Sequence, residues 1–377
     1  MLINSLVLVP SHLLWNWTAD YYNQTAGILS KDNVVIVVLW AEKATIKDLV
    51  LKRKRHKIIR EEYKNLWLFT PIYPIPFLRF SIIEKANVFV NMVLLKIIIR
   101  IFINKKFSSK ILWIFYPEFV FYLNYFKDFK SLYDCVDYYD DLPKNKLFVF
   151  TQRHAEAQLS NNSLRVFANS QVLLNKLSKL SKDIKLVPQG FSSPCNINYP
   201  TPMKIKKIKR PVVGYAGGIN DRLDYCLLYE IIKNNSNWNF VFWGPIQTQN
   251  PLLSDIIKAK NVYYGKSDIR DEVYSVIRKF DIGMLPYDPS IDFNKYCYPM
   301  KLFEYLYMGK PVISTPIQEL ELFLKYVTIV RSVLEWEKSI KKLLLKPWPN
   351  VYQKEQRRIA EANSWENKLG EITTFMH

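Results

Sequence analysis

Lys301 and Glu304 lie one helical turn apart in the segment Pro299–Pro316, PMKLFEYLYMGKPVISTP, and could together bind a nucleotide. The free N–H groups and the positive dipole end of a helix beginning at Pro299 can hold a diphosphate. Lys301 would add positive charge there, and Glu304 would accept hydrogen bonds from both hydroxyls of a ribose. A capped surface helix with a solvated Glu304 and Lys301 fits the same spacing, so the segment alone leaves both interpretations open.

The residue pattern around this pair predicts a helix followed by a buried strand. Apolar residues recur at helical spacing from Met300 to Met308 and leave Tyr305, with the charged pair, on other faces. Pro299 suits a first helical position, and Gly309 suits the left-handed residue that follows a helix. The stretch 310–315, KPVIST, then predicts a buried parallel strand.

A second candidate phosphate site follows the predicted strand at 211–216. Gly214, Gly217 and Gly218 cluster there in a chain that holds only 10 glycines. Small residues in a strand-to-helix turn let the backbone approach a phosphate, and Arg222 offers a planar guanidinium to bind one. The glycine spacing is not GxGxxG, so by itself the cluster is weak evidence for a phosphate site. The Pro299 segment supports it, because it predicts a second phosphate-binding turn. In a doubly wound sheet both turns lie at the carboxyl ends of strands, where ligands bind.

Strand and helix signals alternate along the chain, which predicts an α/β fold with parallel sheets between helices. Residues 194–210 interrupt the pattern with prolines and the basic string MKIKKIKR, and the alternation then restarts. We therefore expect two doubly wound, Rossmann-like domains at residues 1–198 and 199–352. The tail 353–377 predicts a polar helix whose Trp365 needs a surface to pack on.

The net charge and the cysteine content of the chain narrow its possible binding partners and its cellular compartment. The formal charge of +19 at pH 7 favours an acidic partner such as anionic lipid, nucleic acid or a phosphorylated substrate. Lysine and arginine are spread along the chain without a nucleic-acid motif, which argues against a nucleic-acid-binding module. The four cysteines form no CxxC pair, which argues against a disulfide framework or a zinc site and fits a reducing compartment.

The stretch Val88–Ile103, VFVNMVLLKIIIRIFI, is the one membrane-like segment. Asn91, Lys96 and Arg100 interrupt its apolar run well short of the about 18 residues that a spanning helix needs. Lys96 and Arg100 share one helix face opposite bulky aliphatic residues, so the pattern fits a helix lying at a membrane interface. A buried domain helix with two snorkelling cations fits it as well.

Taken together, motifs of the second half resemble the retaining glycosyltransferases of family 4, which have the GT-B fold. The matching segments are Gly217-Gly218 with Arg222, DIGMLPY at 281–287, PMKLFEY at 299–305, GKPVIST at 309–315 and Ser364-Trp365. The first half is similar, more loosely, to a bacterial subgroup that makes surface polysaccharides or teichuronic-type polymers. The segments that carry this second similarity are YDCVDY at 133–138, ANS at 168–170 and VPQG at 187–190.

The resemblance implies a metal-independent hexosyltransferase that uses a UDP- or GDP-linked sugar donor. Glu304 would hold the ribose, and Arg222 and Lys301 would neutralise the diphosphate leaving group. Backbone groups of the Gly217-Gly218 turn and of the helix start at Pro299, Lys301 and Leu302 would complete the donor site. The two domains would face each other across a cleft, and the C-terminal helix would cross back onto the first domain.

Two residues of the first domain, His12 and Asp137, are candidates for contact with the sugars. His12 lies in the loop after the first predicted strand, and Asp137 lies in the acidic run 134–141, DCVDYYDD. The run could be mistaken for a metal-binding DxD motif, but its place after a strand favours a wall between the domains. Asp137 would there touch the acceptor or the donor sugar, although purely structural roles fit both residues.

The chain departs from the family pattern at one position that bears on sugar recognition and on the stereochemistry of transfer. Many members carry two Glu residues separated by seven others, and the position eight before Glu304 is Tyr296. Sugar identity and retention of configuration therefore stay open. A nucleotide-sugar epimerase of the same fold and a non-catalytic GT-B scaffold are the alternatives. An epimerase needs paired acids or histidines, which four scattered histidines do not supply, and the presence of Glu304 argues against a scaffold.

The sequence thus predicts a glycosyltransferase in the cytoplasm, held by its cations at the inner face of the plasma membrane. Its partners would be a nucleotide-sugar donor, a lipid-linked or glycan acceptor and a peripheral anionic membrane surface. Neither nucleic acid, nor a metal, nor another cofactor is expected.

Overall fold

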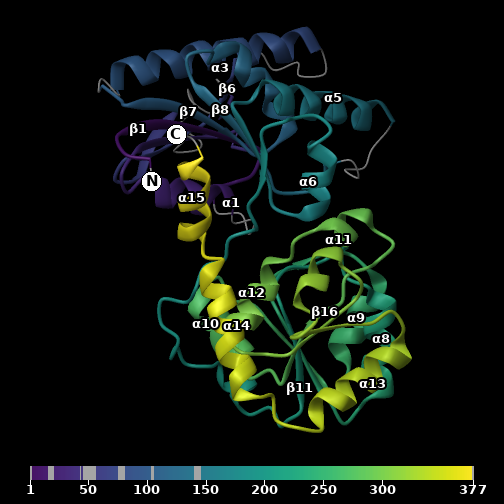
Figure 1. Ribbon diagram of the computed structural model, residues 1–377. Coiled ribbons are helices and arrows are strands. Elements are labelled where there is room, and N and C mark those ends of the chain that lie inside the picture. Colours follow the sequence, from purple (N-terminus) through teal and green to yellow (C-terminus); the bar gives the residue numbers. More distant parts are fainter. Residues whose placement is uncertain are drawn as a thin grey trace. The chain divides into compact units, whose positions relative to one another are not determined.

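The computed structural model describes residues 2–15, 21–42, 44–45, 57–74, 81–102, 106–139 and 146–375 (Figure 1). They form two compact units, each built around its own mostly parallel sheet, which confirms the predicted α/β class. Unit 1 comprises Met1–Asn169, Leu173–Val187 and Leu369–His377, and unit 2 comprises Ser170–Val172 and Pro188–Lys368.

Unit 1 contains an eight-stranded sheet in the order β10-β9-β8-β7-β1-β2-β5-β4. All neighbouring strands are parallel except β4 and β5. The central strands β1 and β2 are buried along their whole length, as expected for a sheet with helices on both faces, and the run VVIVVL of β2 suits that place. The strands are β1 (Ser5–Ser11), β2 (Val34–Leu39), β4 (Ile59–Tyr63), β5 (Leu66–Phe69), β7 (Ser109–Ile114), β8 (Lys130–Cys135), β9 (Arg165–Ala168) and β10 (Ile184–Leu186).

The helices of unit 1 pack around this sheet, and the longest of those described, α3, runs as one continuous rod (Figure 1). It begins at Ser81, ahead of the predicted membrane-like stretch. The helical segments are α1 (Tyr21–Leu29), α3 (Ser81–Phe102), η1 (Pro117–Phe121), α4 (Tyr122–Tyr125), α5 (Lys146–Asn162) and α6 (Gln171–Leu177), and a short separate sheet joins β3 (Ala44–Thr45) to β6 (Ile72–Tyr73).

Unit 2 contains a six-stranded, wholly parallel sheet in the order β15-β13-β11-β16-β17-β18. Its strands are β11 (Val212–Ala216), β13 (Asn239–Trp243), β15 (Val262–Gly265), β16 (Ile282–Leu285), β17 (Val312–Ser314) and β18 (Val327–Ile329), and β12 (Ile219–Asn220) pairs separately with β14 (Ile246–Gln247). Its helices are α7 (Met203–Lys206), α8 (Tyr225–Asn234), α9 (Pro251–Lys258), α10 (Arg270–Ile277), α11 (Asp292–Tyr296), α12 (Met300–Tyr307), η3 (Gln318–Phe323), α13 (Val333–Leu344) and α14 (Asn350–Ala362).

The last helix, α15 (Trp365–Thr374), contributes to both units. In unit 2, the Trp365 ring covers Gly190, where a Cβ would come within 2.5 Å of the indole. In unit 1, Glu371 pairs with Lys185 of β10 at 3.0 Å. The surface that Trp365 packs on therefore includes the VPQG segment singled out in the sequence.

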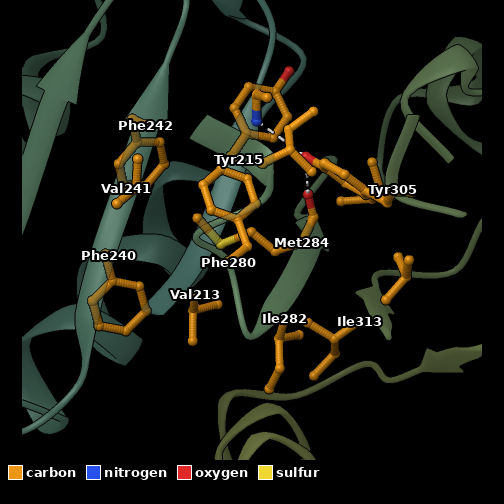
Figure 2. Packing of buried hydrophobic residues seen from close by; sticks show 14 of the residues in the cluster. Val213, Tyr215, Phe240, Val241, Phe242, Phe280, Ile282, Met284, Tyr305 and Ile313 are labelled. Atoms are coloured by element: carbon orange, nitrogen blue, oxygen red, sulfur yellow. Dashed lines mark hydrogen bonds between the residues drawn. The ribbon is translucent and has the colours of Figure 1, made fainter. Parts of the chain in front are cut away.

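Figure 2 shows the aromatic core of unit 2 around Phe280 and Tyr305, and two glycines on adjacent strands make room for these rings. Gly214 of β11 lies in register with Gly283 of β16. A Cβ at Gly214 would lie 2.3 Å from the Phe280 ring, and one at Gly283 would lie 2.6 Å from the Tyr305 ring. Gly214 is thus required by packing against Phe280 and not, as the sequence indicated, by approach to a phosphate.

Tyr305 joins α12 to this sheet. It is fully buried, so its predicted place away from the apolar face of the helix was wrong. Its hydroxyl accepts a hydrogen bond from the Ala216 N–H at 3.0 Å and lies 3.4 Å from the Met284 carbonyl oxygen (Figure 2). The carboxyl ends of β11 and β16 are therefore linked to one side chain of α12.

Tyr305→Phe should destabilise unit 2 by about 1–3 kcal/mol, because it leaves the buried Ala216 N–H without an acceptor. The free energy of unfolding, measured on the full chain in urea, tests this expectation. Tyr263→Phe, which removes a hydroxyl from a partly buried tyrosine of β15, is the matched control and should change little. Equal stability of wild type and Tyr305→Phe would contradict the proposed link.

Lys310 follows the end of α12, and its ammonium donates to the Arg278 carbonyl oxygen at 2.9 Å. Burial, together with the nearby charge of Arg210, lowers the pKa of Lys310 to about 8. The folded chain therefore favours the neutral amine more than the unfolded chain does.

Because the unfolded chain keeps this proton to higher pH, the Lys310 contribution to stability should rise between about pH 8 and pH 10.5. Lys310→Met has no such titration, so its stability relative to wild type should fall by up to about 3 kcal/mol across that window. Urea unfolding at several pH values measures the difference. Lys258→Met, which replaces an exposed lysine, is the control, and its free energy of unfolding relative to wild type should stay constant across these pH values. A constant difference between Lys310→Met and wild type would refute the role given to Lys310.

Candidate functional site

The candidate residues of unit 2 lie where the order of its strands reverses. The chain passes from β11 outward to β13 and β15, and then returns to β16, β17 and β18 on the other side. Loops after the carboxyl ends of two such adjacent strands form the crevice in which doubly wound sheets bind ligands. The Gly217 turn follows β11, and the segment leading to α12 follows β16.

Lys301 lies directly over the Gly217 backbone. A Cβ at Gly217 would come within 1.8 Å of Lys301 Cε and 2.7 Å of its Nζ, and the glycine has a φ of +142°. Only glycine fits this position, because the conformation is rare for other residues and the side chain of Lys301 occupies the space. The Lys301 ammonium also lies 5.6 Å from the centre of the Tyr215 ring.

The turn itself is held from both sides. The Gly217 N–H donates to the Trp243 carbonyl oxygen at 2.8 Å, and the Tyr215 hydroxyl donates to the Gly218 carbonyl oxygen at 2.9 Å. A Cβ on Gly218 would lie 2.8 Å from the Gln247 side-chain oxygen. Both predicted glycines are therefore part of a tightly packed turn beside Lys301.

Arg222 is fixed by a buried asparagine and two aromatic rings. Its Nε donates to Asn294 Oδ1 at 2.7 Å, and Asn294 Nδ2 donates back to the Arg222 carbonyl oxygen at 2.9 Å. The guanidinium lies 4.5 Å from the centre of the Phe293 ring and 4.8 Å from that of Tyr287. Cation–π contact and this hydrogen bond hold the charge in one place.

Asn294 and Phe293 were not among the site residues predicted from the sequence. Asn294 stands in a polar stretch, and no spacing rule marks it. Its role depends on α11 placing it beside Arg222, which lies far away along the chain.

The start of α12 differs slightly from the prediction. Pro299 is the residue before the helix, which begins at Met300. The Leu302 side chain is buried and its N–H donates to the Pro299 carbonyl oxygen at 3.0 Å, so Leu302 offers a ligand no side chain. Gly309 ends the segment with a φ of +63°, as predicted.

Glu304 follows Lys301 by one turn on the partly exposed side of α12. Burial raises the pKa of the Tyr305 hydroxyl well above its ordinary value, and the negative charge of Glu304 raises it further. The carboxylate thus stands close to the residue that links α12 to the sheet. Unit 2 therefore brings Gly217, Lys301 and Glu304 to one switch point, with Arg222 fixed in the turn that follows.

His12 lies at the corresponding place in unit 1, where β1 and β7 form the switch point. Its Nδ1 pairs with the Glu118 carboxylate, and its ring lies 3.9 Å from the Tyr116 ring, centre to centre. Tyr116 and Glu118 both come from the segment after β7. Neither residue was predicted from the sequence, because only the order of the strands brings this segment beside His12.

Asp137 follows β8 and connects to His12 through two tyrosines. The Tyr21 hydroxyl donates to Asp137 Oδ2 at 3.3 Å, and the Tyr116 hydroxyl donates to the Tyr21 oxygen at 2.9 Å. Burial and the Asp137 charge raise the pKa of Tyr21 well above its ordinary value, so these phenols stay neutral donors. The structure thus brings the two predicted first-domain residues into one polar cluster.

One further aspartate of the acidic run, Asp134, lies in the core of unit 1. Asp134 is buried and accepts a hydrogen bond from Trp113 Nε1 at 3.3 Å, while Asp140 and Asp141 lie outside the described residues. Among the side chains that the structure describes, no three His, Cys, Asp or Glu residues come together as a metal site.

Comparison with known proteins shows similarity in sequence to a curated protein and in structure to several solved ones. No protein-family model matches the chain. TuaH of Bacillus subtilis, assigned to teichuronic acid biosynthesis as a glycosyltransferase, is 28% identical over 172 residues. The match covers 44% of this chain and 42% of TuaH, so it spans less than half of that relative.

Solved structures match the chain over its whole length. Sucrose-phosphate synthase from Thermosynechococcus elongatus is 14% identical with a TM-score of 0.73, covering 99% of this chain and 98% of that one. A UDP-forming α,α-trehalose-phosphate synthase from Burkholderia vietnamiensis is 11% identical with a TM-score of 0.68 and the same coverage. A glycosyltransferase from Rickettsia africae is 12% identical with a TM-score of 0.65, covering 99% and 97%. The chain therefore has the GT-B fold of glycosyltransferases, and its sequence is similar to that of a teichuronic acid glycosyltransferase.

Proposed function

We propose that this protein transfers a hexose from a nucleotide sugar to a glycan or lipid-linked acceptor during synthesis of a bacterial surface polysaccharide. The similarity to TuaH and the fold support this class of reaction. The observation that carries the proposal is the Lys301 ammonium lying over the Gly217 turn, at the switch point of a doubly wound sheet. A positive charge held beside the turn that follows a strand of such a sheet is suited to binding a diphosphate.

The chemistry assigned to this site is electrostatic. Departure of the nucleoside diphosphate creates negative charge, and Lys301, Arg222 and the N-terminus of α12 would stabilise it more in the transition state than in the ground state. Arg222 is well suited to this role because Asn294 and two aromatic rings keep it from reorganising during the reaction. With these cations in place, the proposed reaction needs no metal.

Glu304 is proposed to bind the ribose of a UDP- or GDP-linked donor. A carboxylate one turn after Lys301 can accept from both ribose hydroxyls while the diphosphate sits at the start of α12. The resemblance to retaining enzymes favours retention of configuration, although Tyr296 stands where many of them carry a Glu.

The polar cluster of unit 1 that contains His12 and Asp137 is proposed to contact the donor or acceptor sugar. His12 keeps a partly exposed imidazole that is oriented by Glu118 and packed on Tyr116. Asp137, at the other end of the tyrosine chain, would accept hydrogen bonds from sugar hydroxyls. The reaction is proposed to take place in the cytoplasm, where the four free thiols would remain reduced.

Glu304→Ala should weaken binding of the cognate nucleoside diphosphate by about a hundredfold, because two charge-assisted hydrogen bonds are lost. Calorimetric titration of the full chain with UDP, GDP, ADP and CMP identifies the base and measures this loss. Glu361→Ala, which removes an exposed carboxylate from α14, should bind like wild type. Absence of binding by every nucleotide, or unchanged affinity in Glu304→Ala, would refute the nucleotide site.

Arg222→Gln and Asn294→Ala should both lower the preference for the nucleoside diphosphate over the monophosphate. Arg222→Gln removes the charge, and we expect the ratio of the two affinities to fall about tenfold or more. Asn294→Ala keeps the Arg222 charge but removes the side chain that holds it in place, so the ratio of the two affinities should fall by a smaller factor. If Asn294→Ala only lowered the fraction of folded protein, both apparent affinities would fall alike and their ratio would stay unchanged. An unchanged ratio would therefore exclude the positioning role of Asn294.

A further inference from the structure

The outer face of α3 carries a stripe of exposed apolar side chains. Ile82, Phe89, Val93, Ile97 and Ile101 are all exposed, from 39% at Val93 to 75% at Ile82. Their spacing of seven and then four residues keeps them on one side of the helix. Single exposed apolar residues are common on proteins, but a connected row along a helix is typical of an interaction surface.

The opposite face fixes which side of α3 points outward. Asn87, Asn91 and Met92 are fully buried there. Asn91 binds the Ile72 backbone twice, accepting from its N–H at 2.8 Å and donating to its carbonyl oxygen at 2.7 Å. The residue that interrupts the apolar pattern in the sequence is therefore the clamp that holds α3 on β6, and the stripe stays exposed.

Cations accompany the stripe. Lys85, Lys96 and Arg100 are exposed, and helical spacing places them on the same half of the helix. Lys96 Nζ also lies 5.7 Å from the centre of the Phe126 ring. Glu84, in the first turn, is the one acidic residue in the sequence of α3.

We propose that the outer face of α3 binds the surface of an anionic lipid bilayer. The stripe would enter the boundary between headgroups and acyl chains, and the three cations would contact lipid phosphates. None of the described helices, α3 included, has both the length and the hydropathy of a membrane-spanning segment.

Charge favours lipid over a second copy of this chain. In a symmetric dimer through the stripe, Lys85, Lys96 and Arg100 of one copy would face the same cations of the other, and like charges across an interface oppose association. An anionic bilayer satisfies both the apolar row and the cations. This surface lies on unit 1 and shares no residue with the nucleotide site, so the two proposals can fail separately.

Sedimentation of the full chain with lipid vesicles tests the proposal. Wild type should bind vesicles of phosphatidylcholine mixed with phosphatidylglycerol and bind pure phosphatidylcholine much more weakly. Phe89→Gln/Ile97→Gln should lower binding at least about tenfold, because apolar area no longer leaves water. Lys96→Gln/Arg100→Gln should lower it about tenfold or more on anionic vesicles only, and added salt should remove that difference.

Leu334→Gln/Leu345→Gln is the matched control, since both leucines are highly exposed near the two ends of α13. It should bind vesicles like wild type, and so should Glu304→Ala. Failure of wild type to bind anionic vesicles, or an equal loss in the leucine control, would overturn the proposal. A wild-type dimer in sedimentation velocity that Phe89→Gln/Ile97→Gln dissociates would also overturn it, because the stripe would then join two copies. Unchanged nucleotide affinity in the α3 variants shows that the donor site is intact in either case.

Discussion

The contact between Tyr305 and the Ala216 N–H is the constraint on which the candidate site of unit 2 depends. It ties α12 to the end of β11, and the register of Gly214 with Gly283 opens the space that the Tyr305 and Phe280 rings fill. Lys301 is one turn before Tyr305 on the same helix. Because Tyr305 is held against the sheet, Lys301 lies over Gly217. Packing in the core therefore determines where this charge lies.

Both units place their polar residues by the same rule. Strands that diverge from a switch point leave a gap between their loops, and side chains from those loops meet there although they are far apart along the chain. In unit 2 this brings Gly217 beside Lys301, and in unit 1 it brings His12 beside Glu118. The sheets supply the rigidity that the proposed function would require, because charges stabilise a transition state only if they are already in position.

Arg222 shows how that rigidity is obtained from unrelated parts of the sequence. An arginine in a surface turn would normally lose much of its effect to motion and water. Here Asn294 binds both the side chain and the backbone of Arg222, and Tyr287 and Phe293 lie close to the guanidinium. The preorganisation comes from the short helix α11 and from the segment after β16.

Several features could be predicted from the sequence because they are local. The alternation of buried strands and helices, the left-handed Gly309 after α12 and the turn at Gly217 all follow from short-range patterns of apolar residues, proline and glycine. The same holds for the pair Lys301 and Glu304, since helical geometry alone fixes their separation.

Other features could not be predicted because they depend on which strands become neighbours. Gly214 serves the packing of Phe280, Tyr305 is buried, Asn294 positions Arg222, and Asn91 clamps α3 to β6. The sequence by itself determined the fold class and the chemical types at the candidate sites. Only the tertiary structure decided which of those groups are held together and which face of α3 stays exposed, because contacts between distant segments are set by strand order and not by spacing.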